Sequence, residues 1–371
     1  MIYSDSSEKN PDPQSPIPNP QPELFCVGNA IVDIFASVDF AWLDGMGITE
    51  PVQHIPRDQA RRILETLNKN PPAAMTVCSG GGAANVAKIA AMLNTGAAFA
   101  GCTGGDELAA VFERELRAAG VVPVLSTGRE ETGVCFVFSC DGKTRPGETR
   151  IAASPGAALE LTEADVPEDL ITGAEAVMLD GYMLERRPLV QHILRLADHR
   201  GIPIALDAAS VFQIREKTED ILQYSRNYPL IVFMNADEAI TFYNTIRKNC
   251  AIIEAAGERE KEALILKEIC PVLKYITEGE IFPIIVIKLG GRGAVVLAGG
   301  NIYHEETFTI IPRNTVGAGD AFCAAFLCAW IRGKPIRECA ALGNKVAREI
   351  LEAPGAKIRA EKLKSLAKLL R

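Results

Sequence analysis

A glycine-rich stretch that ends in a carboxylate stands in front of a long apolar run near the C-terminus. Residues 314–320 are Asn-Thr-Val-Gly-Ala-Gly-Asp, and the uncharged run 321–331 that follows them is AFCAAFLCAWI. If this run is helical, it is apolar on every side, so we expect a buried helix. The first turn of such a helix exposes backbone N–H groups without partners, and Gly317 and Gly319 allow another group to approach them closely.

This combination would suit phosphoryl transfer. The N–H groups at the helix start would hold an anion. The carboxylate of Asp320 would accept the proton of an attacking hydroxyl while the N–H groups hold the moving phosphoryl group. The alternative is a plain glycine-rich helix start, in which Asp320 only offsets the helix dipole.

A second glycine-rich stretch, Ser-Gly-Gly-Gly-Ala-Ala-Asn at residues 79–85, precedes an expected helix over residues 86–93. Its glycines again favour close approach of a ligand to the backbone. The spacing Gly80-x-Gly82 matches a dinucleotide fingerprint only in part, because Asn85 replaces its last glycine and no clear first strand precedes it. An oxidoreductase that binds NAD(P) is therefore disfavoured. Asn85 would either cap the helix or bind a hydroxyl group.

Four apolar segments after residue 175 are expected to be strands of a buried parallel sheet with helices on both faces. In such sheets, ligands bind at the carboxyl ends of the strands. Each of the four segments carries a polar residue at this end, namely Asp180, Asp207, Asn235 and Lys288. Each could be an ordinary strand end, but together they predict a site at this edge.

Two of these strand ends carry further patterns. Asn235 and Glu238 have the spacing of a capping box, and a glutamate at this place could instead hold Mg²⁺ directly or through water. Residues 290–293, Gly-Gly-Arg-Gly, would form either a hairpin turn or a flat surface for a nucleotide. The chain has no G-x-x-x-x-G-K-[ST] sequence, so a P-loop is excluded.

Segments with an alternating pattern predict a small sheet apart from the main layer. In residues 31–40, Asp33 interrupts apolar positions, and it would be either a turn residue or a carboxylate that accepts hydrogen bonds from a polyol. Strands over 132–140 and 149–153 flank Asp141-Gly142-Lys143, which predicts a hairpin with a long loop. Such a sheet could serve as a lid.

The composition is that of a globular protein without a nucleic-acid or membrane partner. Of the 371 residues, 48% are hydrophobic, and the net charge of −8 argues against binding to nucleic acid or an anionic membrane. No apolar run has the length of a membrane span, and no signal peptide is evident. The ten cysteines include no C-x-x-C pair and the four histidines no metal spacing, so we expect a cytoplasmic protein. Residues 1–22 are polar and proline-rich, which predicts a disordered tail.

Together these motifs resemble the ribokinase/PfkB family of carbohydrate kinases, and within it the adenosine-kinase-like branch. The resemblance covers about residues 24–357. Its most specific element is Asn-Thr-Val-Gly-Ala-Gly-Asp-Ala-Phe at 314–322, which is similar to the family's D-T-x-G-A-G-D signature except at Asn314. The stretch 79–85 is similar to the family's G-G-x-x-x-N signature.

The resemblance implies a fold and a domain layout. The fold would be α/β, a ribokinase-like three-layer αβα sandwich with a mostly parallel sheet and a small β-sheet lid. One kinase domain would span residues 23–371, with a discontinuous lid from about 33–56 and 126–157. The lid would exclude water, which competes as a phosphoryl acceptor.

The resemblance also implies a role for each motif. Asp320 would be the catalytic base, and the anion hole would be formed by the backbone of Gly317, Ala318, Gly319 and Asp320. The sugar hydroxyls would be bound by Asp33, Gly80, Gly81 and Asn85. The ATP site would be formed by Asn235, Lys288, Gly290, Gly293 and Asn344, with Glu238 serving Mg²⁺.

The implied activity is an ATP-dependent kinase that transfers the γ-phosphate to a primary hydroxyl of a sugar or ribonucleoside. A nucleoside would need an apolar shelf, for which Phe35, Phe136 and Phe138 are candidates, although they could instead form the core of the lid. Asn314 replaces the family's usual Asp, which puts activation by a monovalent cation in doubt, and Gly82 stands where many adenosine-kinase-like members have Ser. The alternative function is a non-catalytic sugar- or nucleoside-binding regulatory protein. Edge strands of the lid could join two chains in a homodimer.

Overall fold

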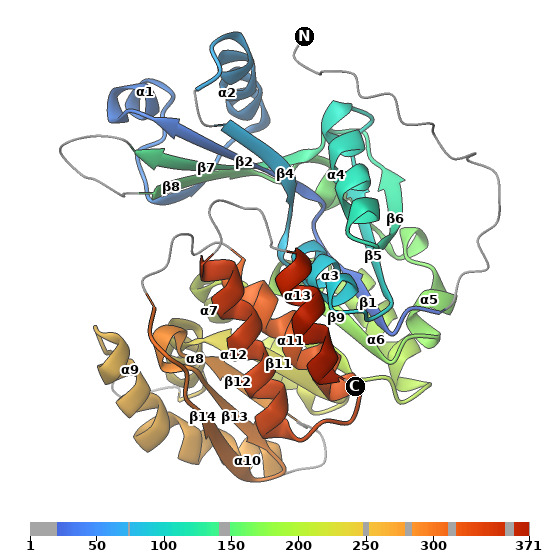
Figure 1. Cartoon of the computed structure of the whole chain (residues 1–371), viewed down its shortest axis with the longest axis vertical. Helices are drawn as coiled ribbons and strands as arrows, with labels where there is room; N and C mark the ends of the chain where they lie inside the picture. Colours follow the sequence, from blue (N-terminus) through green and yellow to red (C-terminus); the bar gives the residue numbers. More distant parts are fainter. Residues whose placement is uncertain are drawn as a thin grey trace.

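The computed structural model describes residues 21–72, 75–140, 149–247, 252–278, 284–310, 317–352 and 360–370. These residues form two β-sheets, one with nine strands and one with five (Figure 1). Most of the expected tail, residues 1–20, lies outside the described residues, and so does Asn314.

The large sheet has the strand order β14-β13-β12-β11-β10-β9-β1-β5-β6. Neighbouring strands from β12 to β6 run parallel, and β13 and β14 add antiparallel strands at one edge. Its strands are β1 (Leu24–Val27), β5 (Ala97–Thr103), β6 (Val122–Thr127), β9 (Ala176–Asp180), β10 (Ile204–Asp207), β11 (Leu230–Asn235), β12 (Ile284–Lys288), β13 (Ala294–Ala298) and β14 (Asn301–Glu305). The mostly parallel sheet predicted from the apolar segments is confirmed.

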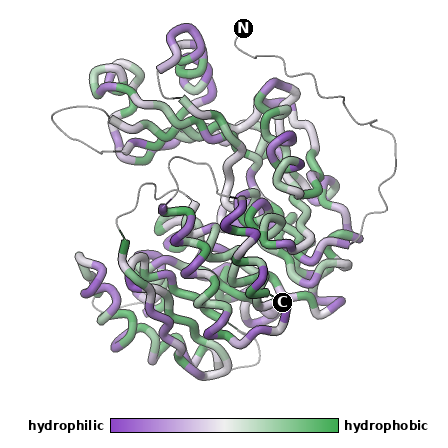
Figure 2. The backbone as a smooth tube through the Cα atoms, in the orientation of Figure 1, coloured by the Kyte–Doolittle hydropathy of each residue, from purple (hydrophilic) through white to green (hydrophobic). Residues whose placement is uncertain are grey.

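Helices cover both faces of the large sheet, which gives three layers. In β1, Leu24 and Cys26 point into one core, and Phe25 and Val27 point into the other. A strand buried on both faces is apolar at successive positions, which explains the uninterrupted apolar segments. Figure 2 shows the hydrophobic residues gathered along the central strands.

Each face of the large sheet is covered by its own set of helices. One face packs against α3 (Gly82–Met92), α4 (Glu107–Ala118), α11 (Ala318–Ile331), α12 (Ile336–Glu352) and α13 (Ala360–Leu366). The other face packs against α5 (Glu168–Thr172), α6 (Arg187–Asp198), α7 (Val211–Ser225), α8 (Ala236–Ile246) and α10 (Cys270–Glu278). Short helical segments are α9 (Glu258–Leu264), η1 (Gly156–Glu160), η2 (Glu163–Asp165), η3 (Gly181–Glu185), η4 (Ile265–Ile269), η5 (Gly290–Arg292) and η6 (Ala367–Leu370).

The small sheet has the order β3-β8-β7-β2-β4. Its strands are β2 (Ile31–Val38), β3 (Val52–His54), β4 (Met75–Gly80), β7 (Gly133–Cys140) and β8 (Thr149–Ser154). Helices α1 (Phe40–Gly45) and α2 (Arg57–Lys69) lie on the side of this sheet that is turned away from the large sheet (Figure 1). β7 and β8 are antiparallel, as the hairpin prediction requires, and residues 141–148 of its loop lie outside the described residues.

Within the part of the chain that the structure describes, helices cover only one of the two faces of the small sheet. Along β2, Val32 and Ile34 are buried on the helical face, whereas Asp33 and Phe35 lie on the opposite, half-buried face. The strand therefore alternates with period two, as a sheet covered on one side should.

The expected lid ranges differ from the observed small sheet at two places. β4 is an edge strand of this sheet, although the ranges 33–56 and 126–157 leave it out. The end of β6, by contrast, belongs to the large sheet. Local pattern did not reveal β4, because its order comes from antiparallel pairing with β2, which is distant in the sequence.

Candidate active site

Helix α11 begins at the glycine-rich stretch, as predicted. Its N-cap is Gly317, which has a left-handed φ of 81° and closes the helix start with no side-chain hydrogen bond. Residues 321–329 are buried, so the predicted all-apolar helix lies in the core. No heavy atom of the described residues lies within 4 Å of the place that a Cβ atom on Gly317 would take. Among the residues that the structure describes, the start of α11 therefore has first-turn N–H groups without helical partners and open space beside Gly317.

Asp320, in the first turn of α11, meets Asn85 of α3. The Asn85 Nδ2 atom donates a hydrogen bond of 2.9 Å to the Asp320 Oδ2 atom. Burial raises the pKa of Asp320 to about 6, and the hydrogen bond from Asn85 acts in the opposite direction. A carboxylate with this pKa is ionised at neutral pH, yet it binds a proton more readily than an exposed one. These are the properties of a general base.

The second glycine-rich stretch forms the start of α3. Its N-cap is Gly81, with φ 86°, and it has no side-chain cap, so Asn85 does not cap this helix. A Cβ atom on Gly80 would lie 2.2 Å from the Asp33 carboxyl group, and one on Gly81 would lie 2.3 Å from the Asn29 carbonyl oxygen. The two glycines thus let β4 and α3 pass close to β2, and this brings Asp33 to the site.

The electrostatic state of Asp33 differs from that of an exposed carboxylate. Burial raises the pKa of Asp33 to about 7, Lys88 lowers it, and the negative charges of Asp320 and Glu115 raise it further. The negative charge of Asp320 in α11 therefore acts on Asp33 in β2, although the two residues are far apart in the sequence.

The four predicted strand ends lie at one edge of the large sheet. Asp207 is in register with Asp180, and Asn235 is in register with Lys288. The predicted gathering of polar residues at the carboxyl ends of the strands is confirmed. Asp180 also serves the structure, since its carboxylate accepts a hydrogen bond from the backbone N–H of Asn29.

Lys288 points toward the start of α11. Its Nζ atom donates to the Asp207 Oδ2 atom at 2.5 Å and lies 3.4 Å from the place of a Cβ atom on Gly319. Although burial opposes it, the negative charge of Asp207 raises the pKa of Lys288, and despite its own burial Asp207 has a lowered pKa beside this ammonium. Cys323 donates to the same Asp207 oxygen at 3.0 Å. A fixed positive charge therefore stands beside the free N–H groups.

Asn235 and Glu238 form the capping box of α8. The Asn235 side chain accepts from the Glu238 N–H, and both Glu238 carboxylate oxygens accept hydrogen bonds from Asn235. Glu238 is only 3% exposed, and burial raises its pKa to about 7. Of the two roles considered for this pair, the structure shows the helix cap. Each carboxylate oxygen of Glu238 has a hydrogen-bond partner within it.

The other residues predicted for the ATP site lie around the antiparallel edge of the large sheet. A Cβ atom on Gly293, which has φ 89°, would lie 2.1 Å from the Glu305 carbonyl oxygen. The Asn344 Nδ2 atom donates to the same carbonyl at 3.1 Å. Gly290 lies beside Glu258. These three residues contact β14 and α9, and not the group formed by Asp33, Asn85 and Asp320.

Sequence reasoning missed Lys88, which is buried in α3 close to the site. Its signal was present, because a lone cation in the apolar segment 86–93 demands a partner. Its position three residues after Asn85 also places it on the same side of the helix.

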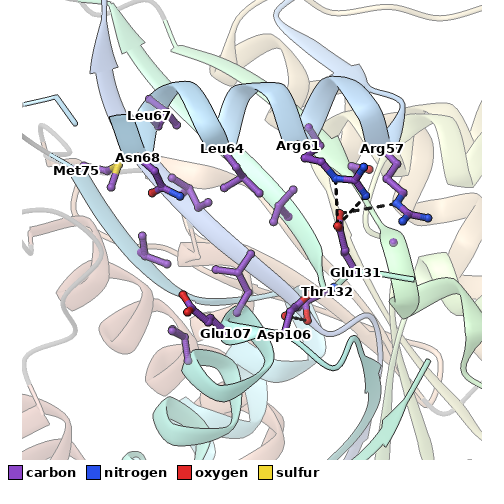
Figure 3. A pocket seen from close by; sticks show the side chains of 18 residues that line it. Arg57, Arg61, Leu64, Leu67, Asn68, Met75, Asp106, Glu107, Glu131 and Thr132 are labelled. Carbon is purple, nitrogen blue, oxygen red and sulfur yellow. Dashed lines mark hydrogen bonds and ion pairs between the residues drawn. The ribbon is translucent and has the colours of Figure 1, made fainter. Parts of the chain in front are cut away.

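A cavity of 380 Å³ lies elsewhere, between α2, the helical face of the small sheet and α4 (Figure 3). Its rim carries Arg57 and Arg61, which point toward Glu131, while apolar residues such as Ile34 line its interior. Ile34 and Asp33 are neighbours in β2 and point to opposite faces of the sheet. The cavity is therefore separated by the sheet from the carboxylates of the candidate site.

Among the residues that the structure describes, no helix has the length and apolar character needed to cross a membrane.

Several known proteins that are similar to this chain are described as kinases. The model of the pfkB family of carbohydrate kinases matches residues 52–363. An adenosine kinase of Dictyostelium discoideum is 23% identical over 359 residues, which cover 92% of this chain and 98% of that protein. An ATP-dependent ribose-1-phosphate kinase of Halopiger xanaduensis is 25% identical over 256 residues, which cover 68% of this chain and 73% of that protein. The structure of an adenosine kinase from Sinorhizobium meliloti has a TM-score of 0.76 at 24% identity and covers 95% of this chain and 100% of its own. With a family model that spans most of its length, the chain belongs to the pfkB family of carbohydrate kinases.

Proposed function

We propose that this chain is an ATP-dependent kinase that phosphorylates a primary hydroxyl of a sugar or ribonucleoside, with Asp320 as the base. The observation that carries the proposal is the pairing of Asp320 with Asn85 at two glycine-rich helix starts, in front of free N–H groups. The acceptor oxygen would form a bond to the γ-phosphorus while its proton passes to Asp320. The bond from this phosphorus to the bridging oxygen would break, and ADP would leave.

The residues at the start of α11 fit the negative charge of a phosphoryl group. Gly317 leaves open space, the first-turn N–H groups lack helical partners, and Lys288 adds a positive charge. These groups would stabilise the charge that spreads over the phosphoryl oxygens, because their positions are set before the reaction.

The described residues contain no group of three His, Cys, Asp or Glu side chains that could hold a metal ion. A Mg²⁺ ion would be held mainly by nucleotide phosphates and water, with Glu238 behind a water molecule, since Mg²⁺ usually keeps several waters and takes only one or two protein carboxylates. When bound, the ion would neutralise charge on the phosphates. Asn235, Gly290, Gly293 and Asn344 remain proposed parts of the ATP site.

We further propose a nucleoside as the acceptor, because the open face of the small sheet has one carboxylate beside apolar side chains. Asp33 lies in register between Cys78 and Cys135, and Phe35, in the next row, faces Val137. Phe136 and Phe138, by contrast, are fully buried on the helical face, so they belong to the core of the small sheet. Asp33 would bind the ribose hydroxyls, and Phe35 would contact the base.

The experiment is a phosphorylation assay with purified protein, ATP and Mg²⁺ against adenosine, other ribonucleosides, ribose and fructose. We expect ADP formation that depends on a nucleoside. The variant Phe35→Ala should raise the KM for the nucleoside about tenfold, since contact of a base with an aromatic ring contributes about 1–3 kcal/mol. Tyr275→Ala, at a surface position 73% exposed, is the matched control. Binding of ATP without any acceptor-dependent turnover would instead support a non-catalytic binding protein.

We also propose that two copies of the chain form a homodimer through the small sheet. Val52, in the short edge strand β3, is 67% exposed, and edge strands can pair between chains. Light scattering of wild-type protein and Val52→Lys would test it, because a charge there should leave only monomers.

A further inference from the structure

Lys88 is a buried lysine in the middle of α3. It is 9% exposed, and its neighbours in the helix, Val86, Ala87, Ile89 and Ala90, are buried apolar residues. Burying an ammonium group is costly unless hydrogen bonds and opposite charges compensate for it. Its place three residues after Asn85 puts this cation directly behind the candidate site.

The Lys88 ammonium holds the end of β4. Its Nζ atom donates to the Ser79 carbonyl oxygen at 2.6 Å and to the Ser79 Oγ atom at 2.9 Å. The N–H and the hydroxyl of Ser79 in turn donate to the Glu115 Oε2 atom of α4 at 2.6 and 3.0 Å. Both peptide groups of Ser79 are thereby fixed immediately before Gly80 and Gly81.

The charge of Lys88 is not cancelled by a direct ion pair. Within the described part of the chain, no carboxylate oxygen lies within 4.0 Å of its nitrogen. The titratable groups that face it are Cys78 of β4, Glu115 of α4, Asp33 of β2 and Asp320 of α11.

The positive charge of Lys88 affects the pKa values of Asp33 and Asp320. Burial raises the pKa values of Asp33 and Asp320, and Lys88 lowers both. The pKa of Lys88 itself is lowered by burial, while these acidic groups oppose that change.

We propose that Lys88 is a positioning residue of the kinase site, which fixes the Gly80-Gly81 backbone for the acceptor and whose buried positive charge favours the charged forms of Asp33 and Asp320. This inference rests on the proposed function. Lys88 would act through Ser79 and through its charge, without touching the acceptor.

The test measures kcat and the KM values for acceptor and ATP from pH 5.5 to 9 in wild-type protein, Lys88→Met and Lys88→Arg. For Lys88→Met we expect a roughly tenfold to hundredfold higher acceptor KM, a much smaller change in the KM for ATP, and an acidic limb of kcat/KM shifted upward by about one pH unit. Lys88→Arg keeps the charge and should restore the acidic limb. The control is Lys345→Met, an exposed lysine of α12.

The outcomes separate this inference from the proposed function. Wild-type protein without any acceptor-dependent turnover contradicts the proposed function itself. If wild-type protein is active and Lys88→Met loses only thermal stability, with an unchanged acceptor KM and pH profile, Lys88 is structural and the inference is overturned. Should Lys88→Met fail to fold, Ser79→Ala decides instead. This variant removes one of the two hydrogen bonds from Lys88, so its acceptor KM should rise several-fold, and an unchanged acceptor KM overturns the inference.

Discussion

Two glycine-rich helix starts meet at the candidate site, and their backbones are alike. Helix α3 follows Gly81 with φ 86°, and α11 follows Gly317 with φ 81°. Neither N-cap makes a side-chain hydrogen bond. An early residue of each helix, Asn85 or Asp320, faces the other helix, and the two side chains are hydrogen-bonded.

Their surroundings differ. A Cβ atom on Gly81 would collide with the Asn29 carbonyl oxygen at 2.3 Å, whereas one on Gly317 would meet no described atom within 4 Å. Gly81 is thus required by packing between two segments of the chain, while packing gives no reason for the free space at Gly317. The same backbone conformation serves the fold at one helix start and leaves room for a ligand at the other.

We expect the largest effect on activity from a change at Asp320, whose carboxylate joins the starts of α3 and α11. Asp320→Asn keeps the size of the side chain but removes the proposed base, so kcat should fall about 10²–10⁴-fold. Steady-state kinetics would show this, with circular dichroism to confirm folding. Asp58→Asn, with a side chain 91% exposed in α2, is the control and should leave kcat unchanged. Near-normal turnover of Asp320→Asn would disprove its role.

Alanine at each glycine should separate packing from ligand binding. Gly317→Ala should lower kcat/KM roughly hundredfold, because its methyl group would enter the proposed phosphoryl space, while the positive φ costs only about 1–2 kcal/mol of stability. Gly81→Ala adds a collision to the same strain, so it should lose much more stability in urea unfolding. Equal losses of stability in the two variants would contradict the comparison.

Activity and stability should change in opposite directions with pH. Since the pKa of Asp320 is raised to about 6, kcat/KM should fall tenfold for each pH unit below that value. The pKa values of Asp33 (about 7) and Asp320 are higher in the folded state than in the unfolded one, so folding takes up protons. The free energy of unfolding should therefore rise as the pH falls from about 8 to 5. A melting temperature that falls together with the activity over this window would argue against these ionisations.

We expect the smallest effect on activity from a change at Gly82, the first residue of α3, which lies close to Asp320 at the start of α11. A Cβ atom there would lie 3.6 Å from the Asp320 Oδ1 atom, so a serine fits without collision. Its hydroxyl could donate to Asp320 and lower the pKa of that carboxyl, which should move the acidic limb of kcat/KM down by a fraction of a pH unit and change kcat less than about threefold. Gly82→Ala separates the hydroxyl from the added carbon, and a serine variant that matches the alanine variant in its pH profile would exclude this hydrogen bond.

Much of the fold could be predicted because its signals are local. The uncharged run 321–331 must be buried wherever it packs, and it is. In α2, the buried residues Ala60, Ile63 and Leu67 recur at a spacing of three or four, so the buried face of this helix also follows from a local pattern. By contrast, the sequence analysis did not identify β4, whose membership in the small sheet depends on pairing with β2.

For the candidate site, the sequence indicated which residues take part but not which of them contact one another. The motifs pointed to Asp320 and Asn85, but their hydrogen bond joins positions 235 residues apart. The spacing of Asn235 and Glu238 could not distinguish a cap from a metal ligand, and the packing of α8 realises the cap. The partner of Lys88 could not be named from the sequence, because Ser79 lies in β4 and is itself held by Glu115 of α4.

The sequence by itself determined the α/β class, the apolar strands of the large sheet after residue 175 and the polar residues at their ends, because hydrophobic periodicity and glycine placement are properties of short segments. Only the tertiary structure decided which glycine is packed and which is open, and which carboxylates are buried together. Those properties depend on distances between segments remote in the sequence, since burial and neighbouring charge shift a pKa only once the chain has folded.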